Sequence, residues 1–286
     1  MSIATSFLSP KSNRQGKVLS GNPMYLDEIP GAMDKMGWRV SAALMRRWFA
    51  TKPAWAMPSA EKVGIDATRL PASRVENRLV TMDWLLSYES VIPVFERLCQ
   101  GWGTQDGRNQ LKDRLIDAGW RPGMVTRLGY GVRTAMQAEL SCQVNYMGFG
   151  SYLDKLDDLF GAVNKGSLKI ALMGKTSRML YSRKDIFEIE KIGVYCRDTY
   201  DFNETWYRDQ LVGLGIWSRS RCLSKMEMAA YAALPPRVKA MQFPGFVPAR
   251  NIDFRRWQTG RNEGGDFYIY SDILWMEPNV NYIALD

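Results

Sequence analysis

Hydrophobic residues recur at helical spacing through the N-terminal half of the chain. Between residues 36 and 51 the apolar positions lie on one helical face: Trp38, Ala42, Met45 and Phe49. Spacings of three and four residues predict an amphipathic helix. Its basic polar face, together with Trp48, leaves a membrane-surface helix open as an alternative to a core-facing one. Proline at positions 53 and 58 should end this helix.

Two more helices are expected before residue 120. The first covers residues 74–98, with a kink or boundary at Pro93. The second covers residues 107–118, and Gly119 should end it because glycine readily adopts the left-handed conformation that follows a helix. Its apolar face is expected to hold three residues: Leu111, Leu115 and Ile116.

After residue 122 the pattern changes to short apolar runs typical of strands. These runs cover residues 140–149, 168–173, 186–196, 213–217, 267–274 and 280–285. A helix is expected over 152–163, with three residues facing inward: Leu153, Leu156 and Phe160. Another is expected over 224–234, where Ser224 and Glu227 have the spacing of a capping box.

The pattern as a whole predicts an α+β fold, with a helical N-terminal half followed by a mostly antiparallel sheet with inserted helices. Residues 1–33 are rich in Ser, Pro, Gly and Asn and should form an extended arm. Residues 34–121 are expected to be helical, and residues 122–286 to form the α+β domain that carries the function.

Length and composition indicate a folded globular chain. It has 286 residues, of which 46% are hydrophobic, enough for a substantial core. No apolar run approaches the roughly 20 residues of a membrane-spanning helix, and no Sec-type signal is recognised at the N-terminus. We therefore expect synthesis in the cytoplasm, which leaves export by a contact-dependent machine open.

The charged and reactive residues narrow the chemistry. A net charge of +8 suits an anionic surface, although a merely soluble surface explains it equally well. The complete absence of histidine excludes Ser-His-Asp and Cys-His catalysis and His-ligated metals. The four cysteines lack CxxC spacing and are interpreted as buried thiols. Chemistry must therefore use carboxylates, Tyr, Lys, Arg, Ser or Cys.

Two motifs are interpreted as structural. Residues 174–177 read Gly-Lys-Thr-Ser, but a phosphate-binding loop needs a glycine where this chain has Lys169. We expect a hairpin turn there and no nucleotide cofactor. Three aspartates at helical spacing are expected to form a solvated helix face: Asp154, Asp157 and Asp158.

The main concentration of candidate chemistry is the stretch from Asp198 to Arg208, which directly follows a predicted strand. It holds two carboxylates, a phenol, an amide and a guanidinium: Asp198, Tyr200, Asp201, Asn203 and Arg208. Scaffolds often place chemistry at strand ends, but Asp and Asn also cap turns through their own backbone. Composition alone leaves both interpretations open.

This stretch resembles the motif of the colicin M-type bacteriocins, in which Asp, any residue, Tyr and Asp are followed after five residues by His-Arg. The match covers Asp198, Tyr200, Asp201 and Arg208, with Tyr207 standing where that family has histidine. Those bacteriocins hydrolyse the lipid-linked peptidoglycan precursor, lipid II, between polyprenol and pyrophosphate. The resemblance implies an antibacterial toxin with this hydrolase activity at a membrane surface.

Over most of its length the chain resembles an uncharacterised proteobacterial family labelled only as a domain of unknown function. The similar phrases are Gly37–Trp38 to Trp48–Phe49, Arg197–Asn203, Leu214–Trp217 and Gly264–Phe267. Genes of that family are associated with type VI secretion loci. The association implies a secreted effector with a cognate immunity protein and a secretion spike or adaptor as partners, delivered to the target-cell periplasm.

The colicin M resemblance also implies roles for individual residues. Arg208 would clamp the anionic substrate, Tyr200 would position it, and Asp198 and Asp201 would act as base or as ligands of Mg²⁺. Tyr207 is a poor base at neutral pH because a phenol has a pKa of about 10.

A second polar concentration follows near the C-terminus. Substrate contacts are expected from four residues: Asn203, Arg255, Arg256 and Arg261. The same arginines would suit a nucleic-acid-targeting toxin, or they form a basic helix before a turn. The main alternative to the hydrolase is a non-enzymatic type VI secretion adaptor that binds cargo, because partner-facing surfaces favour Tyr, Trp, Met and Arg; the nucleic-acid-targeting toxin ranks third.

Overall fold

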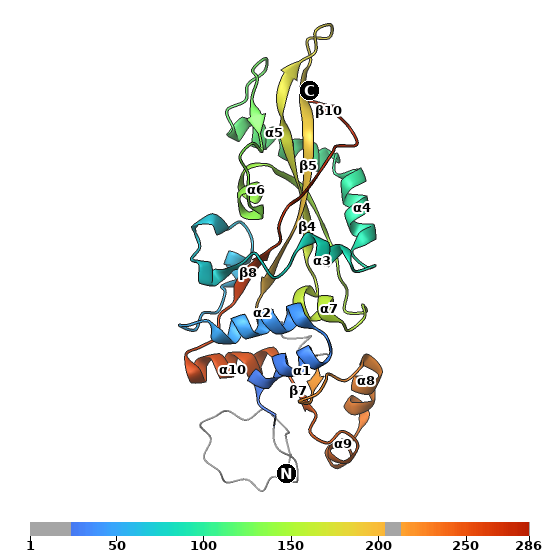
Figure 1. Cartoon of the computed structure of the whole chain (residues 1–286). Helices are drawn as coiled ribbons and strands as arrows, with labels where there is room; N and C mark the ends of the chain where they lie inside the picture. Colours follow the sequence, from blue (N-terminus) through green and yellow to red (C-terminus); the bar gives the residue numbers. More distant parts are fainter. Residues whose placement is uncertain (1–23, 204–212, 286) are drawn as a thin grey trace. The chain divides into compact units, whose positions relative to one another are not determined.

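The chain has an α+β fold, as the hydrophobic pattern predicted (Figure 1). The computed structural model describes residues 24–203 and 213–285. They form two compact units, each assembled from separate segments. Unit 1 comprises residues up to 63, 155–162 and 200–267, and unit 2 comprises residues 64–154, 163–199 and from 268 onward. The boundary expected near residue 122 therefore does not coincide with a division between the units.

Unit 1 is mainly helical, with one short two-stranded sheet in its described part. Its helices are α1 (Ile29–Lys35), α2 (Arg39–Ala50), most of α7 (Asp158–Val163), α8 (Lys225–Ala233), α9 (Pro236–Gln242) and α10 (Asn251–Arg261), with 3₁₀ turns at η1 (Leu26–Glu28) and η2 (Ser59–Lys62). Strands β6 (Ile216–Trp217) and β7 (Val247–Pro248) pair antiparallel.

An aromatic cluster around Trp48 forms the core of unit 1. The fully buried Trp48 ring packs edge-on against Phe202, with ring centroids 4.9 Å apart, and against Phe254 at 5.5 Å. Phe202 and Phe254 stack with centroids 3.7 Å apart. Edge-to-face and stacked pairs stabilise a core beyond simple area burial. Helix α2 therefore faces the core, and Trp48 does not supply a membrane-binding face.

Asp158 stabilises the start of helix α2. Its carboxylate accepts hydrogen bonds from the N–H groups of Val40 at 3.0 Å and Ser41 at 2.7 Å, and from the Ser41 hydroxyl. The first N–H groups of a helix lack partners within the helix, and an acidic group there also complements the helix dipole. The expectation that Asp158 belongs to a solvated face was wrong, because the side chain is buried.

Unit 2 is built on one large sheet with short helices. Its strands are β1 (Val75–Glu76), β2 (Arg127–Leu128), β3 (Gln143–Gly148), β4 (Ser167–Arg178), β5 (Asp185–Tyr200), β8 (Phe267–Tyr270), β9 (Leu274–Met276) and β10 (Tyr282–Ala284). Its helices are α3 (Met82–Leu86), α4 (Ile92–Gly101), α5 (Gln105–Asp117) and α6 (Ala135–Ser141), with 3₁₀ turns at η3 (Ala67–Arg69) and η4 (Ala72–Arg74).

The long antiparallel hairpin of β4 and β5 organises this sheet. Neighbouring strands follow the order β1, β8, β5, β4, β2, while β3 pairs with β4, and β9 and β10 pair with β5. The β4–β5 register runs from Ser167 opposite Arg197 to Arg178 opposite Asp185. Strand β1 pairs in parallel with β8, whereas β4 pairs antiparallel with β2, β3 and β5, and β5 pairs antiparallel with β9 and β10. Tyr200 and Phe267, at the ends of β5 and β8, belong to unit 1.

Several predicted elements are confirmed by the structure. Helix α2 lies within 36–51, α5 covers residues 107–117 of the expected 107–118, and Gly119 lies just after it with a left-handed φ of +90°. The capping box of Ser224 and Glu227 begins α8. Cys142, Cys196 and Cys222 are buried free thiols, whereas Cys99 is half-buried. Within the described ranges, no helix is both long and apolar enough to cross a bilayer.

Other expectations were wrong in detail. Residues 174–177 lie inside strand β4, and the turn comes later, because β4 keeps pairing with β5 as far as Arg178. The helix expected over 74–98 begins only with α3, because β1 covers Val75–Glu76. The boundary expected at Pro93 is confirmed, because Pro93 lies in the first turn of α4, where its missing N–H is tolerated.

The burial of individual residues also corrects the predictions for three stretches of the chain. In the expected arm of residues 1–33, residues 26–33 are helical, because Leu26, Ile29 and Met33 are buried on one side. Residues 1–23 lie outside the described part. Helix α7 begins only at Asp158, and Leu153 is exposed rather than inward-facing. Ile116 on α5 is likewise exposed.

Candidate functional site

The predicted motif begins on strand β5 and continues past its end. Asp198 lies in β5 as part of unit 2, whereas Tyr200, Asp201 and Asn203 belong to unit 1. Tyr207 and Arg208 fall outside the described residues. The expectation that the whole motif converges in one cleft therefore stays a prediction.

Tyr200 is part of the aromatic core of unit 1. Its ring stacks on Phe267 with centroids 5.1 Å apart and planes 6° apart, and meets Phe202 edge-on at 5.6 Å. Burial raises the pKa of the Tyr200 phenol well above its ordinary value. This phenol therefore stays protonated across the physiological range, and its ring holds the exit of β5 against the core.

Asp201 forms an ion pair at the end of β5. Its carboxylate accepts a hydrogen bond from Lys62 Nζ at 2.7 Å and another from the Asn203 N–H at 3.2 Å. The Asp201 side chain is only 8% exposed, whereas Lys62 is 32% exposed. The second bond is the turn-forming contact that aspartate makes with its own backbone two residues on. The carboxylate is thus fixed beside a cation at the point where the motif continues.

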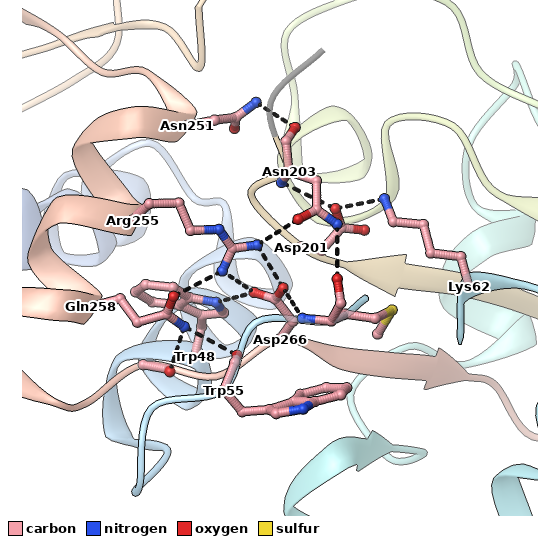
Figure 2. A network of polar contacts seen from close by, with 11 residues as sticks. Trp48, Trp55, Lys62, Asp201, Asn203, Asn251, Arg255, Gln258 and Asp266 are labelled. Atoms are coloured by element: carbon pink, nitrogen blue, oxygen red, sulfur yellow. Dashed lines mark hydrogen bonds and ion pairs between the residues drawn. The ribbon is translucent and has the colours of Figure 1, made fainter. Parts of the chain in front are cut away.

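Asn203 connects this strand end to helix α10 (Figure 2). Its side-chain oxygen accepts from Arg255 Nη2 at 3.0 Å, and its side-chain nitrogen donates to the Met57 carbonyl at 3.3 Å. Its own carbonyl accepts from Asn251 Nδ2 at 3.1 Å. The amide predicted to contact substrate therefore also fastens the chain that leads into residues 204–212.

A buried ion pair between Arg255 and Asp266 forms the centre of the network in Figure 2. Arg255 Nη1 donates to one carboxylate oxygen at 2.9 Å, and Nη2 donates to the other at 2.6 Å. Asp266 also accepts from Trp48 Nε1 at 2.9 Å and from the Met57 N–H at 2.8 Å. Arg255 is 18% exposed and Asp266 is 0% exposed. Both Nη groups of Arg255 thus bind an internal carboxylate.

The other predicted arginines remain at the surface of helix α10. Arg256 is exposed. Arg261 lies over the Trp257 ring, with its guanidinium carbon 4.9 Å from the centroid, and is 3.7 Å from the carboxylate of Asp27. The expectation of a basic helix followed by a turn is confirmed, because Asn262 ends α10 in a left-handed conformation.

The surroundings of Asp201 bear on the expected Mg²⁺ site. The groups shown to contact its carboxylate are an ammonium and a backbone N–H, which are hydrogen-bond donors rather than metal ligands. Across residues 24–203 and 213–285, no cluster of three or more Asp, Glu, Cys or His side chains is placed to hold a metal. Mg²⁺ binding by Asp198 and Asp201 stays a prediction from the sequence.

Unit 2 contains a second polar cluster that sequence reasoning missed. The Glu139 carboxylate on α6 accepts from Lys169 Nζ on β4 and from the Tyr270 hydroxyl on β8. Arg197 Nε on β5 lies 3.4 Å from the same carboxylate. Two cations thus share one carboxylate in a half-buried site. The available signal was a lysine inside the apolar run Leu168–Met173.

Burial and charge shift the pKa values of three side chains in and beside this cluster. Burial lowers the pKa of Lys169, although the neighbouring Glu139 charge opposes that shift. Burial and the Glu139 charge raise the pKa of both Tyr195 and Tyr270. Tyr195 lies opposite Lys169 on the paired strand, and its buried hydroxyl has no hydrogen-bond partner among the described residues.

Comparison with known proteins places the chain in a family. No curated protein and no solved structure matched it. The model of one family, described as a family of unknown function (DUF6402), matches residues 24–284. This match spans both compact units and nearly the whole chain. The chain therefore belongs to the family of unknown function DUF6402.

Proposed function

We propose that this protein is an antibacterial effector that hydrolyses lipid II between polyprenol and pyrophosphate, as the colicin M-type bacteriocins do. The observation that carries the proposal is Asp201, a mostly buried carboxylate paired with Lys62 at the exit of β5. It lies within the stretch that has the bacteriocin spacing. The effector would act in the target-cell periplasm and be neutralised by a cognate immunity protein.

The proposed reaction needs a proton acceptor and an anion clamp. Asp201 accepts a proton from water as the water oxygen bonds to phosphorus, the phosphorus–oxygen bond to the polyprenol breaks, and the leaving oxygen takes up the proton. Lys62 supplies positive charge beside the carboxylate. Arg208 clamps the pyrophosphate. Tyr200 and Asn203 act by holding the strand exit in place.

The decisive experiment compares two carboxylates of similar burial. Asp201→Asn should lower lipid II hydrolysis by roughly 10²-fold or more, because general-base catalysis contributes on that order. Asp253→Asn is the matched control: Asp253 on α10 is also 8% exposed, and it pairs with Arg250, which precedes the helix. Equal activity of both folded variants would contradict the role of Asp201.

Tyr207 offers a second test of the same chemistry. If a histidine at this position carries the proton transfer in related enzymes, Tyr207→His should raise turnover and introduce a pH dependence near the ordinary imidazole pKa of about 6.5. Tyr207→Phe serves as the control. A folded Tyr207→His variant with unchanged turnover and pH profile would mean that the motif is similar in sequence but not in catalytic chemistry.

Mg²⁺ binding by Asp198 and Asp201 is a separate prediction from the sequence. Titration calorimetry of the natural chain and of Asp198→Asn measures it directly. Heat of binding in the natural chain that disappears in the variant would bring a metal into the reaction. The absence of binding, with unchanged hydrolysis in the variant, would leave the carboxylate mechanism above.

A non-enzymatic secretion adaptor is the second candidate. It is favoured by two exposed methionines on neighbouring helices of unit 1, Met226 on α8 and Met241 on α9. Flexible, polarisable methionine side chains suit binding surfaces. An adaptor should retain cargo binding in Asp201→Asn and lose it in Met226→Ser with Met241→Ser. Lipid II hydrolysis by the natural chain, unaffected by the methionine changes, would contradict this candidate.

A further inference from the structure

The turn that closes the β4–β5 hairpin presents two large apolar side chains to solvent. The Met179 N–H donates to the Lys184 carbonyl at 2.9 Å, and the Arg183 N–H donates back to the Met179 carbonyl at 3.0 Å. This closed turn leaves Leu180 91% exposed and Tyr181 102% exposed. Because both residues lie inside a hydrogen-bonded loop, their exposure is set by the backbone. Large apolar side chains displayed together indicate an interaction site.

A neighbouring loop adds apolar groups to the same end of unit 2. Loop 121–126 is fastened to strand β4, because the Thr126 N–H donates to the Thr176 hydroxyl at 2.7 Å and the Thr176 N–H donates to the Thr126 carbonyl at 2.8 Å. Met124 and Val125 in this loop are exposed. We call this loop and the turn of residues 179–184 together the hairpin apex.

Basic side chains lie in the same turn and loop as these apolar groups. An open depression in unit 2 is lined by four basic side chains: Lys112, Arg121, Arg183 and Lys184. Its lining includes one acidic side chain, Asp185, which accepts from the Gly123 N–H and lies 3.6 Å from Arg178. The hairpin apex therefore combines exposed apolar side chains with a neighbouring depression whose lining carries a net positive charge.

We propose that the hairpin apex anchors the protein to an anionic phospholipid bilayer. Leucine, tyrosine, methionine and valine would enter the interfacial region, while lysine and arginine in the same turn and loop would meet lipid phosphates. Each cation near such a surface contributes roughly a fivefold gain in binding. Nucleic acid fits this surface less well, because the aliphatic side chains Leu180, Met124 and Val125 have no counterpart on a phosphate backbone.

This inference rests on the proposed function in one respect: it names the surface on which a lipid-linked substrate is met. It does not depend on catalysis. The membrane-surface alternative for residues 36–51 is excluded for Trp48, which is buried in the core of unit 1. The hairpin apex, in unit 2, has the composition that the alternative required.

Vesicle sedimentation of the full chain tests the anchor. The natural chain should sediment with vesicles of phosphatidylglycerol and phosphatidylcholine in equal parts, but not with pure phosphatidylcholine vesicles. Leu180→Ser with Tyr181→Ser should reduce the bound fraction at least tenfold, and Arg183→Glu with Lys184→Glu should do so most strongly at low salt. Circular dichroism verifies that each variant is folded.

The matched control removes exposed apolar groups from unit 1. Met226→Ser with Met241→Ser should leave vesicle binding unchanged, because neither methionine belongs to the hairpin apex. Equal loss in this control would show non-specific hydrophobic adsorption and overturn the proposal. Retained binding by the Leu180 and Tyr181 double variant, or equal sedimentation with neutral vesicles, would also overturn it.

A parallel assay separates failure of the anchor from failure of the proposed function. Asp201→Asn should bind vesicles like the natural chain, and the Leu180 and Tyr181 double variant should still hydrolyse lipid II dissolved in detergent. A natural chain that hydrolyses lipid II but ignores anionic vesicles overturns the anchor alone. A chain that binds vesicles through the hairpin apex but hydrolyses nothing supports the anchor and overturns the proposed activity.

Discussion

Each of the two polar clusters has one carboxylate at its centre, but the number of cations that face this carboxylate differs between them. In unit 1, Asp266 receives four hydrogen bonds and one cation, Arg255. In unit 2, Glu139 faces two cations, Lys169 and Arg197. A saturated, charge-matched network locks a structure, whereas surplus charge and an unmet hydroxyl leave a cluster sensitive to its surroundings.

The largest expected effect is at the centre of the unit 1 network. Asp266→Ala should destabilise the fold by about 3–5 kcal/mol, because it leaves the Arg255 cation partly buried without its carboxylate. Urea denaturation measures the change. Glu263→Ala is the control, since that carboxylate forms an exposed pair with Lys52 and should cost less than about 1 kcal/mol. Similar losses of stability in the two variants would mean that the network around Asp266 does not stabilise the fold more than a surface ion pair does.

The next largest effect concerns the phenol that binds Glu139. Tyr270→Phe should cost about 1.5–3 kcal/mol, because it removes a hydrogen bond to a charged group. The comparison with Asp266→Ala is sharpened by measuring both in urea under one set of conditions. If Tyr270→Phe left the free energy of unfolding unchanged, the two cations alone would satisfy the carboxylate.

The pH dependence of stability should expose the surplus charge in unit 2. The folded-state pKa of Lys169 lies below its ordinary value of 10.5 because of burial. Between these two pKa values the unfolded chain binds more protons than the folded one, so stability rises with pH there. We expect the natural chain to gain stability relative to Lys169→Met as pH rises through this window. The measurement is best kept below pH 10, since the raised pKa of Tyr270 has the opposite effect above it.

That gain should be smaller than the Tyr270→Phe effect, because the attraction of Glu139 offsets much of the burial of Lys169. A constant difference between natural chain and variant across the window would contradict the shift. If the stability of the natural chain relative to Lys169→Met fell as pH rose, the pKa of Lys169 would be raised rather than lowered.

The smallest expected effect is at Tyr195. Tyr195→Phe removes a buried hydroxyl without a partner among the described residues. Stability should therefore change by less than about 0.5 kcal/mol or increase slightly, because no hydrogen bond is lost. A loss as large as that of Tyr270→Phe would mean that the hydroxyl has a partner in solution, such as an ordered water.

Local signals explain which features could be predicted from the sequence. The Ser224 and Glu227 capping box and the stop at Gly119 depend on residues a few positions apart, so the sequence displays them directly. Helix α2 was predictable for the same reason. Residues 174–177 were misassigned because the pairing of β4 with β5, and not the local composition, keeps them extended.

Long-range clusters could not be predicted in this way. Glu139, Lys169, Arg197 and Tyr270 come from four elements, and only the completed sheet brings them together. Asp158 looked like part of a solvated acidic face, because its hydrogen-bond donors, the first N–H groups of α2, lie 117 and 118 residues away. The candidate motif was recognisable as letters, but the ion pair of Asp201 with Lys62 was not.

The discontinuous composition of the units sets the order in which they can be completed during synthesis. Trp48 and its partner Asp266 are 218 residues apart. At a bacterial elongation rate of roughly 5–20 residues per second, the indole leaves the ribosome about 10–40 s before its carboxylate. Helix α2 must therefore wait with an uncovered aromatic face until nearly the whole chain has been made. A nascent chain of this kind is a natural client for chaperones that bind exposed apolar segments.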